Sequence, residues 1–395
     1  MSKSVSLRIL LVGNFEPDRQ QSMLHFERMM AAGLAARGHQ VETISPRPVL
    51  ARLARPYRYA GWPKWLGYAD KFLVFPRLLR RRARAFRPDV VHIVDHANAV
   101  YADAVEGWPL VCTCHDLLQI RAASGEFPQH RPGGLGVRFQ RWILRHIRGL
   151  DHVVCVSQQT RVDLARLAGL PAEKIAVIPN GLNHPYRRRA AGEAGAALRA
   201  LAVRNGLPDG IWTESPGFLL NVGGGQWYKN RGGLLEIYAG VRAGLDRPPL
   251  LLLAGKPLSE EHRQRVEALG LAEHVKELGP VSVDELEGLY SLAEGLLFPS
   301  WAEGFGWPLA EAQACGCAVF TSNRPPMTEV GGEAAVYFDP ANPEAAARAI
   351  VGAWPGRRRA GEAGFLQAGA WSGELMMQRY ETLYREICGE VPATR

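Results

Sequence analysis

The sequence predicts an α/β protein with two doubly wound, parallel β-sheet domains. Short apolar runs typical of buried strands alternate with helix-like stretches along most of the 395 residues. This alternation indicates βαβ units whose parallel sheets are covered by helices on both faces. It occurs in two sets, separated by a stretch without a clear strand. The chain is also too long for one ordinary hydrophobic core, so two domains are expected.

The first set contains six candidate strands, each a short run of mostly apolar residues. They are Leu7–Asn14, Val41–Ser45, Val90–Asp95, Leu110–His115, His152–Ser157 and Ile175–Pro179. Helices are expected between them, for example over Gln20–Arg37 and Gln158–Ala168.

The second set also contains six candidate strands. They are Phe218–Gly223, Leu250–Gly255, Val275–Leu278, Gly295–Phe298, Ala318–Ser322 and Ala335–Phe338. The linker between the two sets is expected within Asn180–Pro216, which is rich in Gly, Ala, Arg and Pro. A last helix, about Trp371–Ile387, carries apolar residues on one face.

The composition describes a soluble globular protein, with 47% hydrophobic and 22% charged residues. No run approaches the ~18 apolar residues of a transmembrane helix. The first residues lack the apolar region of a secretory leader, so we expect a cytoplasmic protein. Two Cys-X-Cys pairs, Cys112 with Cys114 and Cys315 with Cys317, lack the CxxC spacing of zinc sites. We therefore expect free thiols and no metal site.

Basic residues are concentrated in residues 1–190, which hold 29 Lys+Arg against 14 Asp+Glu. This excess suggests an anionic partner: nucleic acid, a phosphorylated substrate or a membrane surface. Arg77–Arg87 has helical character, and Arg55–Tyr68 interleaves cations with aromatic residues. Both segments suit a lipid headgroup layer or a single-stranded nucleic acid, and they equally suit solvated helices over core aromatics. Our hypothesis is peripheral membrane association through residues 52–87.

The run from Pro299 to Glu311 holds the most informative pair of acidic residues. It places Glu303 and Glu311 eight positions apart around a glycine-containing turn. An apolar strand precedes it, and Pro308 suits a helix start because its missing N–H is not needed there. Glu303 is therefore expected at a strand's carboxyl end and Glu311 in the next helix, where open α/β sheets bind ligands. The two carboxylates can accept hydrogen bonds from hydroxyl groups, and the helix N-terminus between them can bind phosphate. A sugar nucleotide has this arrangement of hydroxyl groups and phosphates.

A glycine turn over Asn221–Arg231 follows a strand and opens a helix. It matches neither the GxGxxG dinucleotide motif nor the GxxxxGK[ST] P-loop. Gly224 and Gly225 offer outward-facing N–H groups, and the cations Lys229 and Arg231 follow them. This combination suits a diphosphate, although a solvated basic helix end would have the same composition.

Three other stretches are ambiguous when each is taken alone. His115 ends a strand, where a histidine can donate to a substrate hydroxyl, but a structural histidine is the simpler interpretation. His92–His96 has a spacing that resembles a metal site, yet it lacks a third ligand in register. Asn180 and Gly181 are consistent with an ordinary turn after a strand.

Taken together, these stretches resemble the family-4 retaining glycosyltransferases. The matching elements are His115-Asp116, Val156-Ser157, Ile178-Pro-Asn-Gly181, Val222-Gly-Gly with Lys229-Asn230, and Glu303-Gly-Phe-Gly-x-Pro-x-x-Glu311. The resemblance continues to Phe338-Asp-Pro340 and so covers nearly the whole chain. It implies the GT-B fold, in which two Rossmann-like domains face a cleft. The implied boundaries are 1–185 for an acceptor-side domain, 186–370 for a donor domain and 371–395 for a helix that crosses back.

The resemblance also implies roles for individual residues. Glu303 and His115 would be catalytic, in contact with the donor sugar, and Glu311 would bind the ribose. The remaining donor site would consist of Asn180, Gly224, Gly225, Lys229, Arg231, Phe305, Gly306 and Trp307. The acceptor would bind near Gly13, Gln21 and Ser22.

Two departures from the family pattern are visible. Many members carry an arginine near Gly223 and Gly224, and here the place holds only glycine. Arg231 or a nest of backbone N–H groups would then bind the diphosphate in place of that arginine. Many members also have a glycine pair after the first strand, whereas this chain has Gly13 followed by Asn14.

The implied activity is transfer of a hexosyl unit from a UDP- or GDP-linked sugar, with retention at the anomeric carbon. The acceptor would be a glycan or a lipid-linked glycan in polysaccharide or glycolipid assembly. No residue stands out as a nucleophile, so front-face attack is favoured, with the leaving phosphate deprotonating the acceptor. Such enzymes are usually metal-independent, so no cofactor is expected, and protein cations would stabilise the diphosphate.

The expected partners are the sugar nucleotide, the acceptor and an anionic membrane surface, and no nucleic acid. The expected location is the cytoplasm, with peripheral binding to the inner face of the cytoplasmic membrane. One alternative is a catalytically silent GT-B homologue that serves as a binding subunit. A less favoured alternative is an NAD-dependent oxidoreductase, for which the turn at Gly13 offers only one glycine.

Overall fold

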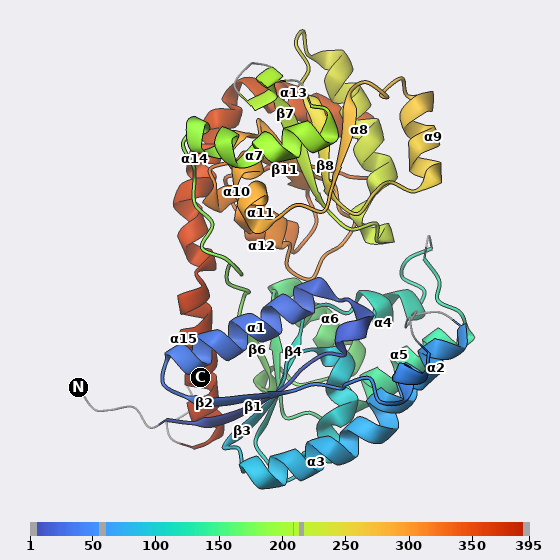
Figure 1. The fold of residues 1–395 in the computed structure, drawn as a ribbon, viewed down its shortest axis with the longest axis vertical. Coiled ribbons are helices and arrows are strands. Elements are labelled where there is room, and N and C mark those ends of the chain that lie inside the picture. Colours follow the sequence, from blue (N-terminus) through green and yellow to red (C-terminus); the bar gives the residue numbers. More distant parts are fainter. Residues whose placement is uncertain (1–5, 55–60, 129, 208, 213–216, 390–395) are drawn as a thin grey trace, which may run out of the picture. The chain divides into compact units, whose positions relative to one another are not determined.

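Figure 1 shows the computed structural model, which describes residues 6–54, 61–128, 130–207, 209–212 and 217–389. The chain divides into two compact units. One holds the residues up to Asn183 together with those from Gly373, and the other holds His184–Ser372. Each unit contains one six-stranded sheet, and all of the strand pairs are parallel. The predicted α/β class with two doubly wound sheets is confirmed, and every expected strand forms within two residues of its expected ends.

The first sheet has the spatial order β2-β1-β3-β4-β5-β6. Its strands are β1 (Arg8–Val12), β2 (Gln40–Ile44), β3 (Val90–Ile93), β4 (Leu110–Cys114), β5 (His152–Cys155) and β6 (Ile175–Val177). The chain adds β2 on one side of β1 and then crosses to add β3 on the other side. The direction of winding therefore reverses between β1 and β3.

Seven α-helices belong to this unit in its described residues. They are α1 (Gln21–Ala36), α2 (Gly61–Ala69), α3 (Phe75–Phe86), α4 (Leu118–Ala123), α5 (Gly134–Ile147), α6 (Gln158–Ala168) and α15 (Gly373–Ile387). The apolar faces of α3, α4, α5 and α6 pack with the strands into one core that includes Leu79, Val91, Ile143 and Leu164. Ser157 caps α6 by accepting from the Thr160 N–H, an arrangement that satisfies one of the unpaired donors of a helix start.

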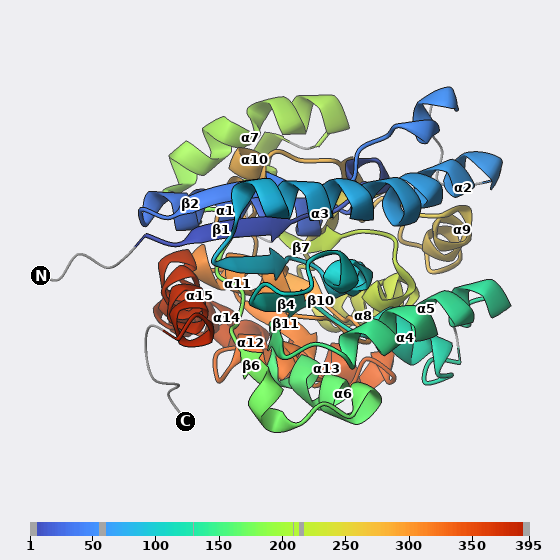
Figure 2. The same ribbon diagram turned by 90° about the horizontal axis from the view of Figure 1, so that it is seen from below.

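The helices α2 and α3 run as one continuous helix, as Figure 2 shows. A π-helical segment, Asp70–Val74, joins them and turns two successive polar side chains, Asp70 and Lys71, into the interior. The Asp70 carboxylate accepts hydrogen bonds from the N–H groups of Val49, Leu50 and Ala51 at 2.8–3.0 Å. The Lys71 ammonium lies 2.6 Å from the Asp18 carboxylate, in the loop between β1 and α1.

The C-terminal helix α15 is fixed to the first sheet by a buried chain of hydrogen bonds. The Tyr384 hydroxyl lies 2.7 Å from His92 Nδ1, and His92 Nε2 lies 2.7 Å from the Thr113 hydroxyl. Thr113 in turn lies 2.9 Å from the Tyr380 hydroxyl. Burial lowers the pKa of His92 to about 3, so the imidazole is neutral and can both accept and donate.

The second sheet has the spatial order β12-β11-β10-β7-β8-β9. Its strands are β7 (Phe218–Gly223), β8 (Leu250–Gly255), β9 (Val275–Gly279), β10 (Gly295–Phe298), β11 (Val319–Ser322) and β12 (Val336–Phe338). The α-helices of its described residues are α7 (Ala191–Asn205), α8 (Arg231–Gly244), α9 (Glu260–Ala268), α10 (Val283–Leu292), α11 (Trp307–Ala314), α12 (Met327–Gly331), α13 (Pro343–Ala353) and α14 (Arg357–Gln367). Leu219, Leu235, Leu297 and Ile350 are part of its core.

The boundary between the two units, after Asn183, lies within Asn180–Pro216, where the linker was expected, but part of this stretch is helical. Residues 191–205 form α7, which packs against α10 and buries Leu198 and Leu201. A Cβ on Gly288 of α10 would lie only 3.2 Å from the Leu198 side chain, so glycine allows this close approach. The alanines that look like linker composition are helix formers. Residues 208 and 213–216 of this stretch lie outside the described residues.

None of the helices in the described residues combines the length and the apolar composition needed to cross a bilayer.

Candidate active site

The two glycine-containing motifs follow neighbouring strands of the second sheet. β7 pairs with β10, and the winding reverses between them because β8 and β9 lie beyond β7 while β11 and β12 lie beyond β10. The glycine turn follows β7, and the segment with Glu303 follows β10. Open α/β sheets bind ligands outside the carboxyl ends of strands at this kind of reversal.

Three contacts join the two loops. The Asn230 amide donates to the Pro299 carbonyl at 3.0 Å, and the Trp301 N–H donates to the Tyr228 carbonyl at 2.7 Å. Lys229 Nζ donates to Glu303 Oε1 at 2.7 Å. Asn230 has a φ of 52° and also caps α8, which suits asparagine because it tolerates the left-handed region. The motifs that the sequence placed 74 residues apart therefore form one structure.

The Lys229–Glu303 ion pair is largely withdrawn from water. The two side chains are 16% and 9% exposed, and the ammonium lies 4.8 Å from the centre of the Phe298 ring. A charge in such surroundings needs a partner, because removal from water is costly. The charge of each group therefore balances the charge of the other. A ligand with suitable groups could replace either partner.

The helix α11 begins beside this pair. Gly306 precedes its first residue with a φ of 97°, and the helix has no side-chain cap at this end. Pro308 stands in its first turn, as expected. The ring of Phe305 is buried and meets Trp371 edge to face at 5.4 Å, which fixes the turn. The helix start contributes N–H groups and partial positive charge next to Glu303.

Glu311 lies within α11 and is 5% exposed. Its carboxylate accepts a hydrogen bond from the Tyr290 hydroxyl of α10 at 2.9 Å. Burial, together with the charge of Glu311, raises the pKa of Tyr290, so the phenol stays a hydrogen-bond donor. The helix spacing thus keeps the two glutamates distinct: Glu303 is paired with a cation, and Glu311 is bonded to a neutral phenol.

Arg231 holds the glycine turn in place. Its guanidinium donates to the carbonyls of Gly223 and Pro257 at 3.1 and 2.9 Å, and the residue is 5% exposed. Burial lowers the pKa of Arg231. In this structure the Arg231 guanidinium is bonded to two loop carbonyls. It therefore does not stand in directly for the arginine that many family members carry near Gly224.

Lys256 is a second cation near the turn, which the sequence did not suggest. It follows β8, and its N–H donates to the Gly223 carbonyl at 3.3 Å. A Cβ on Gly225 would lie 3.5 Å from Lys256 Cδ, so the lysine stem lies against the glycine turn. A Cβ on Gly255 would meet the Gly223 carbonyl oxygen at 2.4 Å, which explains the glycine beside it.

In the first unit, His115 follows β4 and is buried. Its Nε2 lies 2.9 Å from the Val94 carbonyl, to which it donates, and its ring meets Phe26 edge to face at 4.6 Å. Burial lowers the pKa of His115, against the opposing effect of Asp95. A neutral ring held in this way keeps Nδ1 as an acceptor.

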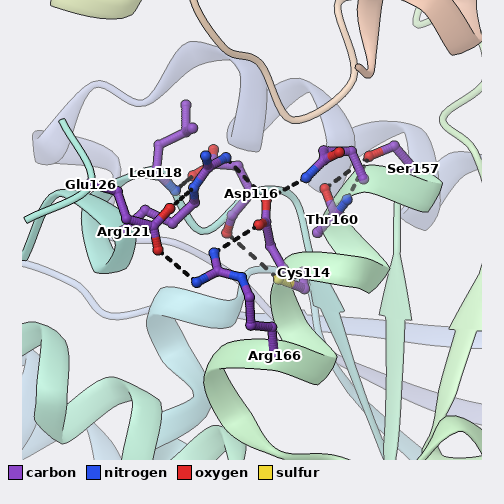
Figure 3. A network of polar contacts seen from close by, with 10 residues as sticks. Cys114, Asp116, Leu118, Arg121, Glu126, Ser157, Thr160 and Arg166 are labelled. Atoms are coloured by element: carbon purple, nitrogen blue, oxygen red, sulfur yellow. Dashed lines mark hydrogen bonds and ion pairs between the residues drawn. The ribbon is translucent and has the colours of Figure 1, made fainter. Parts of the chain in front are cut away.

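Figure 3 shows the polar network that fixes the segment after His115. The Asp116 carboxylate accepts from the Leu118 N–H at 3.0 Å at the start of α4. Arg121 pairs with Glu126 at 2.8 Å, and Arg166 of α6 pairs with the same carboxylate at 2.8 Å. The network therefore joins α4 to α6.

Of the three residues expected at the acceptor site, Gly13 directly follows β1, and Gln21 and Ser22 begin α1. A Cβ on Gly13 would meet Glu27 Oε2 at 2.0 Å, so a larger residue there would displace the Glu27 carboxylate. Gln21 and Ser22 are exposed in the first turn of α1. Asn180, expected at the donor site, follows β6, and its Oδ1 is buried without a hydrogen-bond partner among the described residues.

A buried polar cluster at the reversal between β1 and β3 was missed by the sequence. Asn14 Nδ2 donates to Asp95 Oδ2 at 2.8 Å, and Asn98 also bonds to Asn14. Burial favours the protonated Asp95, but His96, His115 and the bonds from Ala97 and Asn14 outweigh it and lower the pKa of Asp95. The spacing over His92–His96 resembles a metal site in the sequence, and nothing local points to Asn14 as a partner of Asp95.

The cysteines are all free thiols, and five of the six are buried. Within the described residues, no three His, Cys, Asp or Glu side chains are placed so that they could hold a metal ion.

Comparison with known families decides the class of the protein. The profile described as Glycosyltransferase Family 4 matches residues 28–184, and the one described as Glycosyl transferases group 1 matches residues 209–353. The chain belongs to the family-4 glycosyltransferases. This family-4 glycosyltransferase therefore carries both halves of the family pattern, one in each unit.

Curated relatives of this glycosyltransferase include enzymes of O-antigen assembly. It is 26% identical over 274 residues to O-antigen chain mannosyltransferase B of Escherichia coli, covering 69% of this chain and 68% of the relative. It is 25% identical over 268 residues to the serotype-specific mannosyltransferase WbdA of Escherichia coli, covering 64% of this chain. The match spans only 31% of WbdA.

Solved structures agree with the fold. The sucrose-phosphate synthase of Thermosynechococcus elongatus superposes with a TM-score of 0.75 at 18% identity, covering 97% of this chain and 100% of that one. HepE of Anabaena, solved in complex with UDP-glucose, gives a TM-score of 0.68 at 18% identity, with 95% and 99% coverage. At this identity the likeness concerns the fold alone, which is GT-B.

Proposed function

We propose that the protein is a retaining glycosyltransferase that moves a hexosyl unit from a UDP- or GDP-linked sugar to a glycan or lipid-linked acceptor. The observation that carries this proposal is the Lys229–Glu303 pair at 2.7 Å. It lies where the winding of the second sheet reverses, beside the start of α11. A sugar nucleotide needs cationic and hydroxyl-binding groups next to one another, and this pair supplies both.

In this proposal, the diphosphate replaces Glu303 as the ion-pair partner of Lys229. The ammonium leaves Glu303 for the phosphate oxygens, and the freed carboxylate accepts hydrogen bonds from hydroxyls of the donor sugar. Phe305, Gly306 and Trp307 would offer N–H groups at the start of α11 to the diphosphate, and Gly224 and Gly225 would do so after β7. Glu311 would accept from the ribose.

The transfer step needs no nucleophile on the protein. The acceptor oxygen attacks the anomeric carbon from the face that the leaving group departs from, and the bond from that carbon to the phosphate oxygen breaks. The acceptor proton moves to the departing phosphate oxygen. Lys229 and the helix N-terminus stabilise the charge that develops on the diphosphate, and His115 contacts the donor sugar. We expect the reaction to need neither a metal nor another cofactor.

The substrate class is supported by the relatives. O-antigen chain mannosyltransferase B and WbdA are named as mannosyltransferases, and HepE was solved with UDP-glucose. Assembly of a bacterial polysaccharide or glycolipid, carried out on the cytoplasmic side, is the setting we propose. Acceptor binding would involve Gly13, Gln21 and Ser22 of the first unit.

A thermal-shift panel of UDP-, GDP- and ADP-sugars tests the donor. We expect the melting temperature to rise clearly with one UDP- or GDP-sugar. The absence of any rise would contradict the proposal that the protein is a glycosyltransferase. Proton NMR of the first glycoside formed then tests retention, because the anomeric configuration of the product must equal that of the donor. Nucleotide binding without any turnover would favour the alternative of a silent GT-B homologue, which the glycine at position 224 supports.

A further inference from the structure

The continuous helix over α2 and α3 exposes one stripe that is apolar at its start and basic at its end. Trp62, Trp65 and Leu73 are 63%, 58% and 61% exposed. Arg77, Arg81 and Arg84 continue the stripe and are exposed as well. The steps from Leu73 through Arg77 and Arg81 to Arg84 are three or four residues, so these side chains share one face.

The opposite face of the same helix is firmly packed. Phe75, Leu79 and Ala83 are buried in the core of the first unit. Tyr68 stacks on Phe139 of α5 at 5.7 Å, and Phe72 meets Trp142 edge to face at 5.1 Å. The exposure of the tryptophans is therefore a property of a fixed helix and does not result from a loose one.

More apolar side chains lie around the start of this helix. The segment 49–53 is held beside α2, where the Asp70 carboxylate accepts from Val49, Leu50 and Ala51. Val49 and Leu53 are 51% and 76% exposed. Of the fourteen large apolar side chains exposed in the described chain, seven lie between residues 49 and 78. A concentration of this kind marks an interaction surface.

The arginines of the stripe differ from their neighbours in their partners. Arg82 forms an ion pair with Glu42, and Arg80 donates to the Asp103 carbonyl at 3.3 Å. Within the part of the chain that the structure describes, Arg77, Arg81 and Arg84 form no ion pair. Three cations on one exposed stripe therefore lack a carboxylate partner and are available to an external anion.

We propose that this stripe, with the apolar segment 49–53 beside it, is a docking surface for an anionic lipid bilayer. Trp62, Trp65 and Leu73 would enter the interfacial region, where aromatic rings are favoured, and the arginines would contact lipid phosphates. Exposed aliphatic side chains such as Leu53 and Leu73 have no use against stacked bases, so a bilayer fits better than a nucleic acid. The inference does not depend on the proposed transfer reaction.

Vesicle flotation of the full chain tests the proposal. We expect binding to phosphatidylcholine vesicles that contain about a third phosphatidylglycerol, and far less to phosphatidylcholine alone. Arg81→Gln with Arg84→Gln should weaken the binding about 25-fold, since each arginine near an anionic surface contributes about fivefold. Trp62→Ser with Trp65→Ser should also weaken it, and this loss should persist at high salt.

Matched variants in the second unit serve as controls. Arg358→Gln with Arg359→Gln removes two exposed arginines from α14, and Val203→Ser with Leu366→Ser removes two apolar side chains that are each 84% exposed. Both controls should float as the unmodified protein does, and unchanged melting should show that all four variants fold. Equal flotation of the Arg81/Arg84 variant and its control would overturn the proposal, as would binding of single-stranded RNA without binding of vesicles.

Discussion

Replacement of either partner of the Lys229–Glu303 pair should destabilise the second unit much more than an exposed ion pair would. The pair lies 2.7 Å apart with side chains 16% and 9% exposed. Attraction at this distance is about 6 kcal/mol at an effective dielectric constant near 20, and desolvation of both groups offsets part of it. Removal of one partner leaves the other charge buried beside Phe298, at a cost of about 3 kcal/mol.

A double-mutant cycle isolates the coupling. We expect Lys229→Met and Glu303→Gln each to lower the free energy of unfolding by about 3 kcal/mol, and the double variant by little more than one of them. The coupling would then be about 2–3 kcal/mol. Urea unfolding gives the free energies, and hydrogen exchange of β7 and β10 peptides assigns the transition to the second unit. Additive single effects would refute the interpretation that the two groups compensate each other.

The same variants test the proposed exchange of partners. If a diphosphate takes Lys229 away from Glu303, Glu303→Gln should bind the free nucleoside diphosphate more tightly, because the competing carboxylate is gone. The same variant should lose at least about 100-fold in transfer rate, because the sugar loses its acceptor. Calorimetric titration measures the first effect and product formation the second. Weaker diphosphate binding by Glu303→Gln would contradict the exchange.

Three further predictions concern other parts of the molecule. Tyr384→Phe should cost the first unit about 1–3 kcal/mol, because it leaves buried His92 Nδ1 without its hydrogen-bond partner, and urea unfolding measures this. The pKa of His92 is about 3 in the folded chain, below its ordinary value, so the unfolded chain takes up the proton first. The contribution of His92 to stability should be fully present above about pH 6.5 and fall by roughly 1.4 kcal/mol per pH unit between about pH 6.5 and pH 3, and His92→Asn should reduce this slope in acid titrations. Lys256→Met should raise the KM for the donor about 10-fold or more and leave unfolding unchanged, whereas equal KM values would remove Lys256 from the diphosphate site.

Much of the fold could be predicted because the strands are buried on both faces. A run such as Val90–Ile93, buried throughout, reads as a strand from its own residues alone. The helix α7 could not be recognised in this way. Its many alanines give little amphipathic contrast, and its helical state is fixed by packing of Leu198 and Leu201 against α10, which comes about 80 residues later in the sequence.

The candidate site likewise contains residues that could be predicted from the sequence and residues that could not. Lys229 and Glu303 each follow a strand that the sequence identifies, so that their carboxyl-end position could be predicted, and the neighbouring positions of β7 and β10 then brought them together. Asn14 and Asp95 also follow neighbouring strands, β1 and β3. They went unrecognised because a lone asparagine after a strand is ordinary turn chemistry.

The two sheets reverse their winding at equivalent places, and this explains why the polar side chains gather where they do. In each sheet the first strand of the unit lies inside, next to the strand that begins the second half of the winding. The loops that leave these two strands run to opposite sides, so their backbone groups are not covered by a crossover helix. In the second unit Lys229 and Glu303 occupy that place, and in the first unit Asn14 and Asp95 occupy it. The pair in the second unit combines a cation with an acid, whereas the pair in the first unit combines a neutral amide with a carboxylate, so the two equivalent places differ in charge.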